Sequence, residues 1–206
     1  MGADRKPLGS RLGHWAAELL LVFLGAYAAF WLNGFQQRQQ DTQRRDQILA
    51  SLEEYVQLIA AQSEKNAVAQ EKRAAEFERA LAAGEMPAIK PIVWTTDYSP
   101  TDIASYVQAG GLNLLDVKTL TTMRNADLVT RSGLSSALHD QKLSDELIVP
   151  NLGKGTSAFY DPATKQLKEP FTAYPATLRS YADFFQRMSK AYNELLNQIR
   201  AERQRH

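Results

Sequence analysis

The chain has 206 residues, of which 24 are basic and 23 acidic, so its formal net charge is +1 at pH 7. This balance gives no overall attraction to nucleic acid, and we expect no nucleic-acid partner. Cysteine is absent, which excludes disulfides, thiolate catalysis and thiolate metal ligands but leaves the compartment open.

The first predicted element is a transmembrane helix over residues 15–34. Its apolar core runs from Trp15 to Leu32 and contains one charged residue, Glu18. Eighteen residues at about 1.5 Å each span roughly 27 Å, close to the hydrocarbon thickness of a bilayer. Trp15 and Trp31 bracket the run, as interfacial anchors at the two headgroup levels do. The sequence therefore predicts one membrane span rather than a buried helix of a soluble protein.

A cleavable signal peptide is the competing interpretation, because Ala26-Tyr27-Ala28 has the small-x-small pattern of a cleavage site. The apolar run, however, continues through Phe30, Trp31 and Leu32, and Glu18 would interrupt the apolar region of a signal peptide. We therefore expect the helix to be retained as an anchor.

The basic residues on the two sides of the anchor do not decide its orientation. Three precede it and three follow it: Arg5, Lys6 and Arg11, then Arg38, Arg44 and Arg45. This count is a tie under the positive-inside rule. A short N-terminus is easily retained while a long domain is exported, so we expect residues 1–14 in the cytoplasm. Residues 35–206 would then form an extracytoplasmic helical domain.

Inside the anchor, three residues are candidates for contact with a partner. Gly25 and Ala29 form a small-xxx-small pair that would let a second helix approach closely. Glu18 lies about one turn inside the membrane, where a charge is costly without a partner. The alternative for Glu18 is an interfacial carboxylate beside Arg11 and His14.

The anchor is followed by a polar neck without proline, and then by an amphipathic stretch predicted to continue as a helix to Ala83. Asn33–Gly34 is a candidate hinge. Apolar residues recur near a 3.5-residue spacing at Ile48, Leu52, Tyr55, Ile59, Ala74, Phe77 and Leu81.

The C-terminal region has the clearest periodicity. Its apolar residues, hereafter the seam, alternate in spacing between three and four: Leu178, Tyr181, Phe185, Met188, Tyr192, Leu195 and Ile199. We expect this helix to pair antiparallel with the 48–81 stripe, with Tyr181 near Phe77 and Ile199 near Leu52 or Ile48. The same pairing would return Arg200, Arg203 and Arg205 toward an anionic bilayer surface.

Between these helices, Ser99–Gln108 is predicted as a short helix. Asp116 is a candidate N-cap for a second one, with Val117, Leu120, Met123 and Leu128 on one side, ending by Gly133. A third should run from Leu134 to Ile148. Residues 157–169 are predicted to form a two-stranded β-hairpin turning at Asp161–Pro162, with a flexible loop as the alternative. The fold class is thus mainly α: an anchor helix continuing into a helical bundle or antiparallel coiled-coil hairpin.

A search for chemistry gives no catalytic, cofactor or metal site. His14, His139 and His206 lack ligand spacing, and Ser135, His139 and Asp140 share one predicted helix instead of converging from separate elements. Gly153–Ser157 resembles a phosphate loop but does not meet its motif. Several aromatic residues are expected to form a core, or alternatively a ligand pocket: Trp94, Tyr98, Tyr106, Phe159, Tyr160, Phe171 and Tyr174.

Two stretches together carry a family resemblance: the run Glu18–Leu32 with its neck, and Gly110–Leu115, which reads Gly-Gly-Leu-Asn-Leu-Leu. They resemble a group of uncharacterised bacterial single-pass inner-membrane proteins. The resemblance implies an inner-membrane setting and brings no functional residues with it.

These observations favour a non-enzymatic, membrane-anchored interaction protein, with a lipid bilayer and a protein partner or a second copy as its partners. It would be an accessory subunit of a membrane complex or a homo-oligomer. A sensor-like extracytoplasmic ligand-binding domain is the alternative hypothesis, and a membrane-tethered enzyme is the third.

Overall fold

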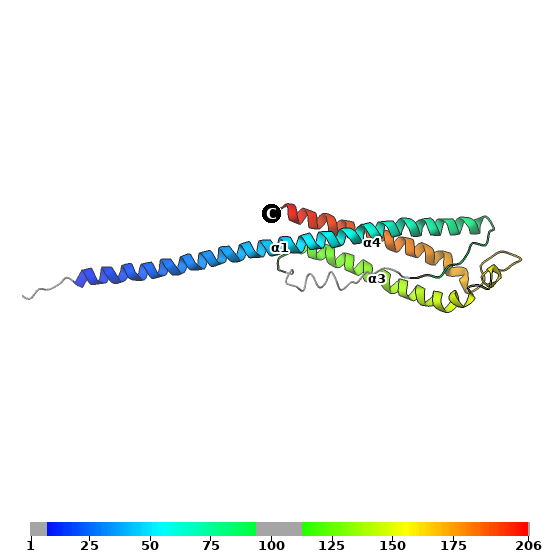
Figure 1. Ribbon diagram of the computed structural model, residues 1–206, viewed down its shortest axis with the longest axis horizontal. Helices are drawn as coiled ribbons and strands as arrows, with labels where there is room; N and C mark the ends of the chain where they lie inside the picture. The colour runs from blue at the N-terminus through cyan, green and yellow to red at the C-terminus, as the bar shows by residue number, and fades with distance from the viewer. Residues whose placement is uncertain (1–7, 94–112, 206) are drawn as a thin grey trace, which may run out of the picture. The chain divides into compact units, whose positions relative to one another are not determined.

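A computed structural model describes residues 8–93 and 113–205 of the chain. Within these ranges the protein is mainly helical, as predicted, with three long helices: α1 (Leu8–Ala82), α3 (Val117–Leu147) and α4 (Tyr174–Gln204). Three short 3₁₀ helices lie between α3 and α4: η2 (Val149–Asn151), η3 (Thr156–Ala158) and η4 (Phe171–Ala173). The predicted helix Ser99–Gln108 lies outside the described residues. Figure 1 shows α3 and α4 packed with the second half of α1.

The chain divides into two compact units, Met1–Asp46 and Gln47–His206. Helix α1 contributes to both, and it continues without a break through Asn33–Gly34, where a hinge was expected. It ends close to the predicted position, because Gly84 adopts a φ of 71°. That left-handed residue lets the Gly84 and Glu85 amides donate to the carbonyls of Leu81 and Ala80 at 3.0 and 2.9 Å, a pairing that caps the helix.

Helices α1 and α4 run antiparallel in the second unit. Arg179, near the start of α4, pairs with Glu71 and Glu78 late in α1. Arg200 near the end of α4 pairs with Glu53. The predicted register is right at one end, where the Arg200–Glu53 pair agrees with Ile199 near Leu52. It is wrong at the other end, where the ring that packs on Phe77 is that of Tyr174 and not Tyr181, with ring centroids 5.1 Å apart.

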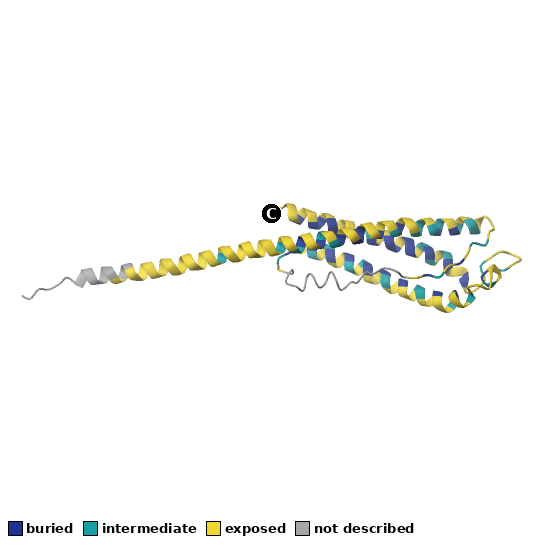
Figure 2. Cartoon of the chain, viewed as in Figure 1, coloured by how far each residue is buried: buried dark blue, intermediate teal, exposed yellow. Residues whose placement is uncertain are grey.

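Helix α4 is buried on two sides, against α1 and against α3 (Figure 2). All seven seam residues are buried. The seam does not pack on α1 alone, because the Tyr181 hydroxyl donates to the Ala137 carbonyl of α3 at 3.1 Å. The hydroxyls of Tyr192 and Thr130 also lie 3.2 Å apart, between α4 and α3. A second set of buried α4 residues widens the apolar face beyond the heptad pattern: Tyr174, Ala182, Phe184, Ala191 and Leu196.

Helix α3 is a single helix, where the sequence predicted two. Gly133 was expected to end the first; instead it lies inside α3, where a Cβ atom would be 1.8 Å from the Phe184 ring of α4. The predicted apolar side of this helix is also wrong in part, because Val117 and Leu128 are 79% and 55% exposed. The side that packs on the bundle is built mostly of small residues: Thr119, Met123, Ala126, Thr130, Gly133, Ala137 and Ser144.

The β-hairpin expected over residues 157–169 is not formed. In the described residues this region has one isolated antiparallel bridge, between Tyr160 and Leu167. The Asp161 carboxylate accepts hydrogen bonds from the amides of Ala163 and Thr164, at 2.8 and 3.1 Å, which closes a local turn. The Tyr160 hydroxyl donates to the Pro87 carbonyl at 2.7 Å and joins this turn to the segment after α1.

We predict that Gly133→Ala destabilises the bundle. Alanine in an exposed helix would raise stability by about 1 kcal/mol, but here the added methyl overlaps a buried ring and should lower the free energy of unfolding by about 2 kcal/mol. Urea unfolding of the full chain in mild detergent, followed by circular dichroism, measures the difference. Ser132→Ala, at the exposed neighbouring position, is the control and should be nearly neutral. Equal stability of the two variants would contradict the close packing at Gly133.

Candidate functional site

The first candidate site is the apolar segment of α1 in the first unit. Its side chains are exposed at position 15 and from 18 to 32: Leu21 by 72%, Phe30 by 79%, and the bracketing Trp15 and Trp31 by 72% and 61%. Within the described residues, the helix that contains it is the one long and apolar enough to cross a membrane. Such a continuous apolar surface on a soluble protein would greatly exceed the largest patch usually left in water.

The three candidate contact residues of this segment are also exposed: Glu18, Gly25 and Ala29. Gly25 has open space where a Cβ would be, with no atom within 4 Å. Seven residues separate Glu18 from Gly25 and four separate Gly25 from Ala29, so all three lie on one side of the helix. The chain thus presents a carboxylate and two small residues along one strip of an apolar helix.

The second candidate site is the ionic cluster around Glu53 in the second unit. Arg200 donates to its carboxylate from Nε at 2.8 Å, and Arg203 donates to the other oxygen. These hydrogen bonds hold the pKa of Glu53 below its ordinary value of 4.5, against the opposing effect of burial. Arg205 pairs with Asp116 at 2.7 Å. The arginines that we expected near the bilayer surface therefore have carboxylate partners at the surface of the second unit.

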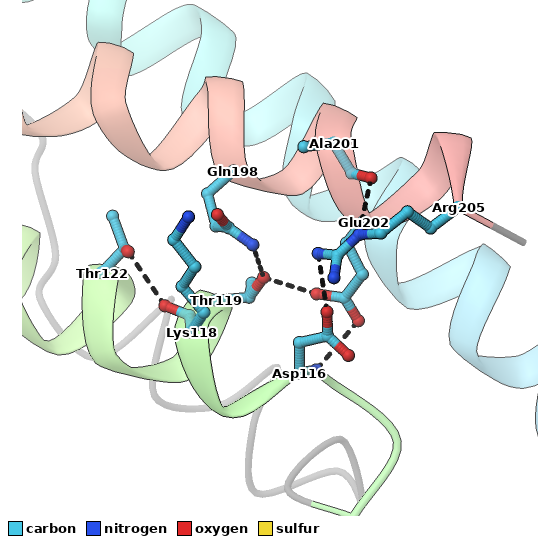
Figure 3. Close-up of polar contacts among 8 residues, drawn as sticks. All are labelled: Asp116, Lys118, Thr119, Thr122, Gln198, Ala201, Glu202 and Arg205. Atoms are coloured by element: carbon cyan, nitrogen blue, oxygen red, sulfur yellow. Dashed lines mark hydrogen bonds and ion pairs between the residues drawn. The ribbon is translucent and has the colours of Figure 1, made fainter.

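Beside this cluster, Glu202 joins the end of α4 to the start of α3 (Figure 3). It is fully buried. One carboxylate oxygen accepts from the Asp116 amide at 2.9 Å, and the other accepts from the Thr119 hydroxyl. Gln198 in turn donates to the Thr119 oxygen at 3.2 Å. Asp116 does take the N-cap position of α3, but its side chain makes no capping hydrogen bond.

Sequence reasoning missed Glu202, although a signal was present. Position 202 follows Tyr181, Met188 and Leu195 at a constant interval of seven residues, so it continues one row of the seam. A carboxylate in such a row is buried if the helix pairing extends that far, and a buried carboxylate needs hydrogen-bond donors. The donors come from α3, whose position the sequence did not reveal.

At the opposite end of the bundle, polar groups again join one element to another. Arg179 lies between Glu71 and Glu78, which raise its pKa by hydrogen bonding. The Tyr174 hydroxyl accepts from Arg73 at 3.0 Å and from the Lys90 amide at 3.1 Å, and it donates to the Lys90 carbonyl at 2.8 Å. These contacts hold the segment after α1 against α4 and carry no sign of a reactive group.

The described aromatic residues of the predicted core or pocket are buried: Phe159, Tyr160, Phe171 and Tyr174. Trp94, Tyr98 and Tyr106 lie outside the described residues. A cavity between α3 and η4, lined by Asp140, Ser144, Phe171 and Tyr174, has a volume of about 70 Å³. Because one water occupies about 30 Å³ in the liquid, this space is too small for an organic ligand of ordinary size.

The remaining candidates for chemistry do not converge. Ser135 and His139 lie at exposed positions of α3, and Asp140 on the same helix has a pKa raised by burial. Gly153 and Gly155 adopt φ values of 84° and 78° around Lys154, whose ammonium donates to Asn151. They form a local turn, and the element directly after it is the short helix η3 rather than a long α-helix. Among the described residues no group of three histidines or carboxylates is placed to hold a metal ion.

No family model, curated protein or solved structure matches this chain.

We predict that the Glu53 cluster makes stability depend on pH. Because the folded-state pKa of Glu53 is lowered, its contribution is present above about pH 4.5 and is lost as the pH falls through the folded-state value. Glu53→Gln should therefore lower the urea midpoint at neutral pH, and the difference from wild type should shrink at about pH 3. Glu54→Gln, at an exposed neighbouring position, is the control and should keep the wild-type pH response. A constant difference between Glu53→Gln and wild type at both pH values would contradict the role of Glu53.

We also predict that Thr119→Val weakens the bundle more than Thr119→Ser. Valine keeps the shape but removes the hydroxyl that serves Glu202 and Gln198, and leaving a buried carboxylate short of a donor costs about 2 kcal/mol. Serine retains the hydroxyl and loses only a methyl group. Urea unfolding of the two variants gives the comparison. A more stable valine variant would show that the hydrogen bonds at Glu202 contribute nothing.

Proposed function

We propose that this chain is a single-pass protein of a bacterial inner membrane whose helical domain acts outside the cytoplasm by associating with other membrane proteins. It is either a homo-oligomer or an accessory subunit of a membrane complex. The observation that carries the proposal is the exposed apolar surface of residues 18–32.

The apolar residues 18–32 are not part of the core of the second unit. The second unit has its own core, built from α1 residues after position 47 together with α3 and α4. An apolar helix left in water loses roughly 25 cal/mol for each Å² that lipid or protein would otherwise cover. A bilayer covers the whole circumference of such a helix, which supports a membrane span over a local contact.

Association is supported by the composition of the strip that contains Glu18, Gly25 and Ala29. Lipid tails give no hydrophobic drive between two membrane helices, so pairing depends on close packing at small residues and on polar contacts. A carboxylate within a membrane is costly unless it has a partner. Glu18 therefore favours a partner helix at the same depth.

The polar clusters of the second unit support a role in assembly over one in catalysis. The carboxylates of Glu53 and Glu202 and the guanidinium of Arg179 each join one helix to another. Such groups hold the helices of the second unit together. The resemblance to single-pass inner-membrane proteins agrees with this reading.

We predict that the full chain stays in the membrane fraction after extraction with alkaline carbonate. A variant in which Leu21 and Leu24 are both replaced by Arg should be lost from it, because two central charges cost about 5 kcal/mol or more. A reporter that is active only outside the cytoplasm, fused after His206, should be active. Activity of a cytoplasm-only reporter at the same position would reverse the proposed orientation.

We further predict that Glu18→Gln and Glu18→Ala change assembly without preventing insertion. Both variants should remain resistant to carbonate, while their complexes in mild detergent elute at a smaller size than the wild type. Glu54→Gln, in the second unit, is the control and should elute like the wild type. Wild-type assembly by both Glu18 variants would leave Glu18 as an interfacial carboxylate without a partner.

A further inference from the structure

Helix α1 carries a second row of residues on the side opposite its bundle contacts. The buried side within the second unit includes Leu52, Val56, Ile59 and Ser63. The second row, hereafter the outer stripe, repeats at intervals of three and four and consists of Leu58, Ala61, Lys65, Val68, Lys72 and Ala75.

The apolar members of the outer stripe are not covered by the chain itself. Leu58 is 66% exposed and Val68 is 67% exposed. Beside them lies an open groove between α1 and α4, whose α4 wall is formed by Gln186, Ser189 and Lys190. A helix with exposed branched residues at heptad spacing, next to a groove, is a surface suited to another helix.

We infer that the outer stripe pairs with the same stripe of a second copy, with the two α1 helices parallel. This inference rests on the proposed function, because that proposal places both copies in one bilayer through their N-terminal segments. It deepens that proposal by naming the partner and the surface.

The charged residues in and beside the outer stripe favour a second, parallel copy of the chain as its partner. Lys65 and Lys72 take the same heptad position, and each follows directly after a glutamate, Glu64 or Glu71. In a parallel pair, a side chain at this position lies beside the residue that precedes its counterpart on the other helix. Lys65 of one copy therefore meets Glu64 of the other, and Lys72 meets Glu71. The two-fold symmetry of the pair doubles each contact.

The other charged groups around the stripe are compatible with this pairing. Glu71 also binds Arg179 of its own chain, and Lys72 lies 3.8 Å from Glu76. Lys190 adds a positive charge to the groove wall. In an antiparallel pair, the row of Glu64, Glu71 and Glu78 would face itself and repel. Two lysines within the outer stripe weaken the pairing of the two copies but fix the register of one helix against the other. Confinement of both copies to the membrane raises their effective concentration.

Cysteine crosslinking of the full chain in native membranes tests the inference, because the chain contains no cysteine. Ala61→Cys and Val68→Cys place single thiols on the outer stripe. Each should give a disulfide-linked dimer under mild oxidation. Leu128→Cys on α3, which replaces a side chain of similar exposure at 55%, is the matched control and should stay monomeric. Equal dimer yield at positions 68 and 128 would overturn the inference, as would crosslinking of Val68→Cys to a different protein.

Charge reversal in the Val68→Cys background tests the parallel direction. Lys65→Glu and Glu64→Lys should each reduce the dimer yield roughly tenfold, since two symmetric contacts become repulsive. The combination of both changes restores the original composition and the attraction, so its yield should return to that of Val68→Cys alone. Failure of the combination to restore crosslinking would overturn the parallel pairing.

The failure of this inference can be distinguished from failure of the proposed function. A chain that resists carbonate extraction and elutes as a complex, yet does not crosslink at positions 61 and 68, would overturn the outer-stripe dimer and leave membrane association standing. A chain that carbonate releases would remove the proposed function, and with it the reason to expect two copies side by side in one bilayer.

Discussion

The structure of the second unit depends on the burial of α4 between α1 and α3. This helix has an apolar face wide enough for two neighbours: one side meets α1 at Phe77 through Tyr174, and the other meets α3 through the hydroxyls of Tyr181 and Tyr192. Removing a large side chain from a face of this kind costs about 2–5 kcal/mol, a large part of the stability of an ordinary domain. Helix α4 therefore joins α3 to the part of α1 that lies in the second unit.

The two contacts of α4 are built differently. Toward α3 the chain uses small residues, and Gly133 lets the Phe184 ring approach the helix backbone. Toward α1 the core is apolar, and ion pairs close its edge at both ends, through Arg179 and through Glu53. Buried hydrogen bonds at Glu202 then join the end of α4 to the start of α3. Packing therefore supplies most of the stability, while the polar groups fix where each helix begins and ends along its neighbour.

The contrast between the two units is the basis of the functional proposal. One unit exposes a continuous apolar surface, whereas the other packs an apolar core of its own. A membrane and a helical partner are the surroundings that we propose for this apolar surface. The outer stripe of α1 extends the same reasoning, because each of its two lysines follows a glutamate that a second parallel copy would place beside the lysine of the first. Assembly is the activity that we propose for these surfaces.

The sequence alone determined the mainly helical class, the long apolar helix near the N-terminus and the heptad row of α4, because all three follow from periodicity along a single segment. Only the tertiary structure decided what that row packs on. The continuity of α3 through Gly133 could not be predicted, since a glycine that ends a helix and one that admits a neighbouring ring look the same in sequence. Glu202 stood in the seam row, but its donors lie in α3, more than 80 residues away. Local patterns specify which face of a helix is apolar; the choice between neighbours depends on shape and hydrogen-bond partners that come together only when the chain folds.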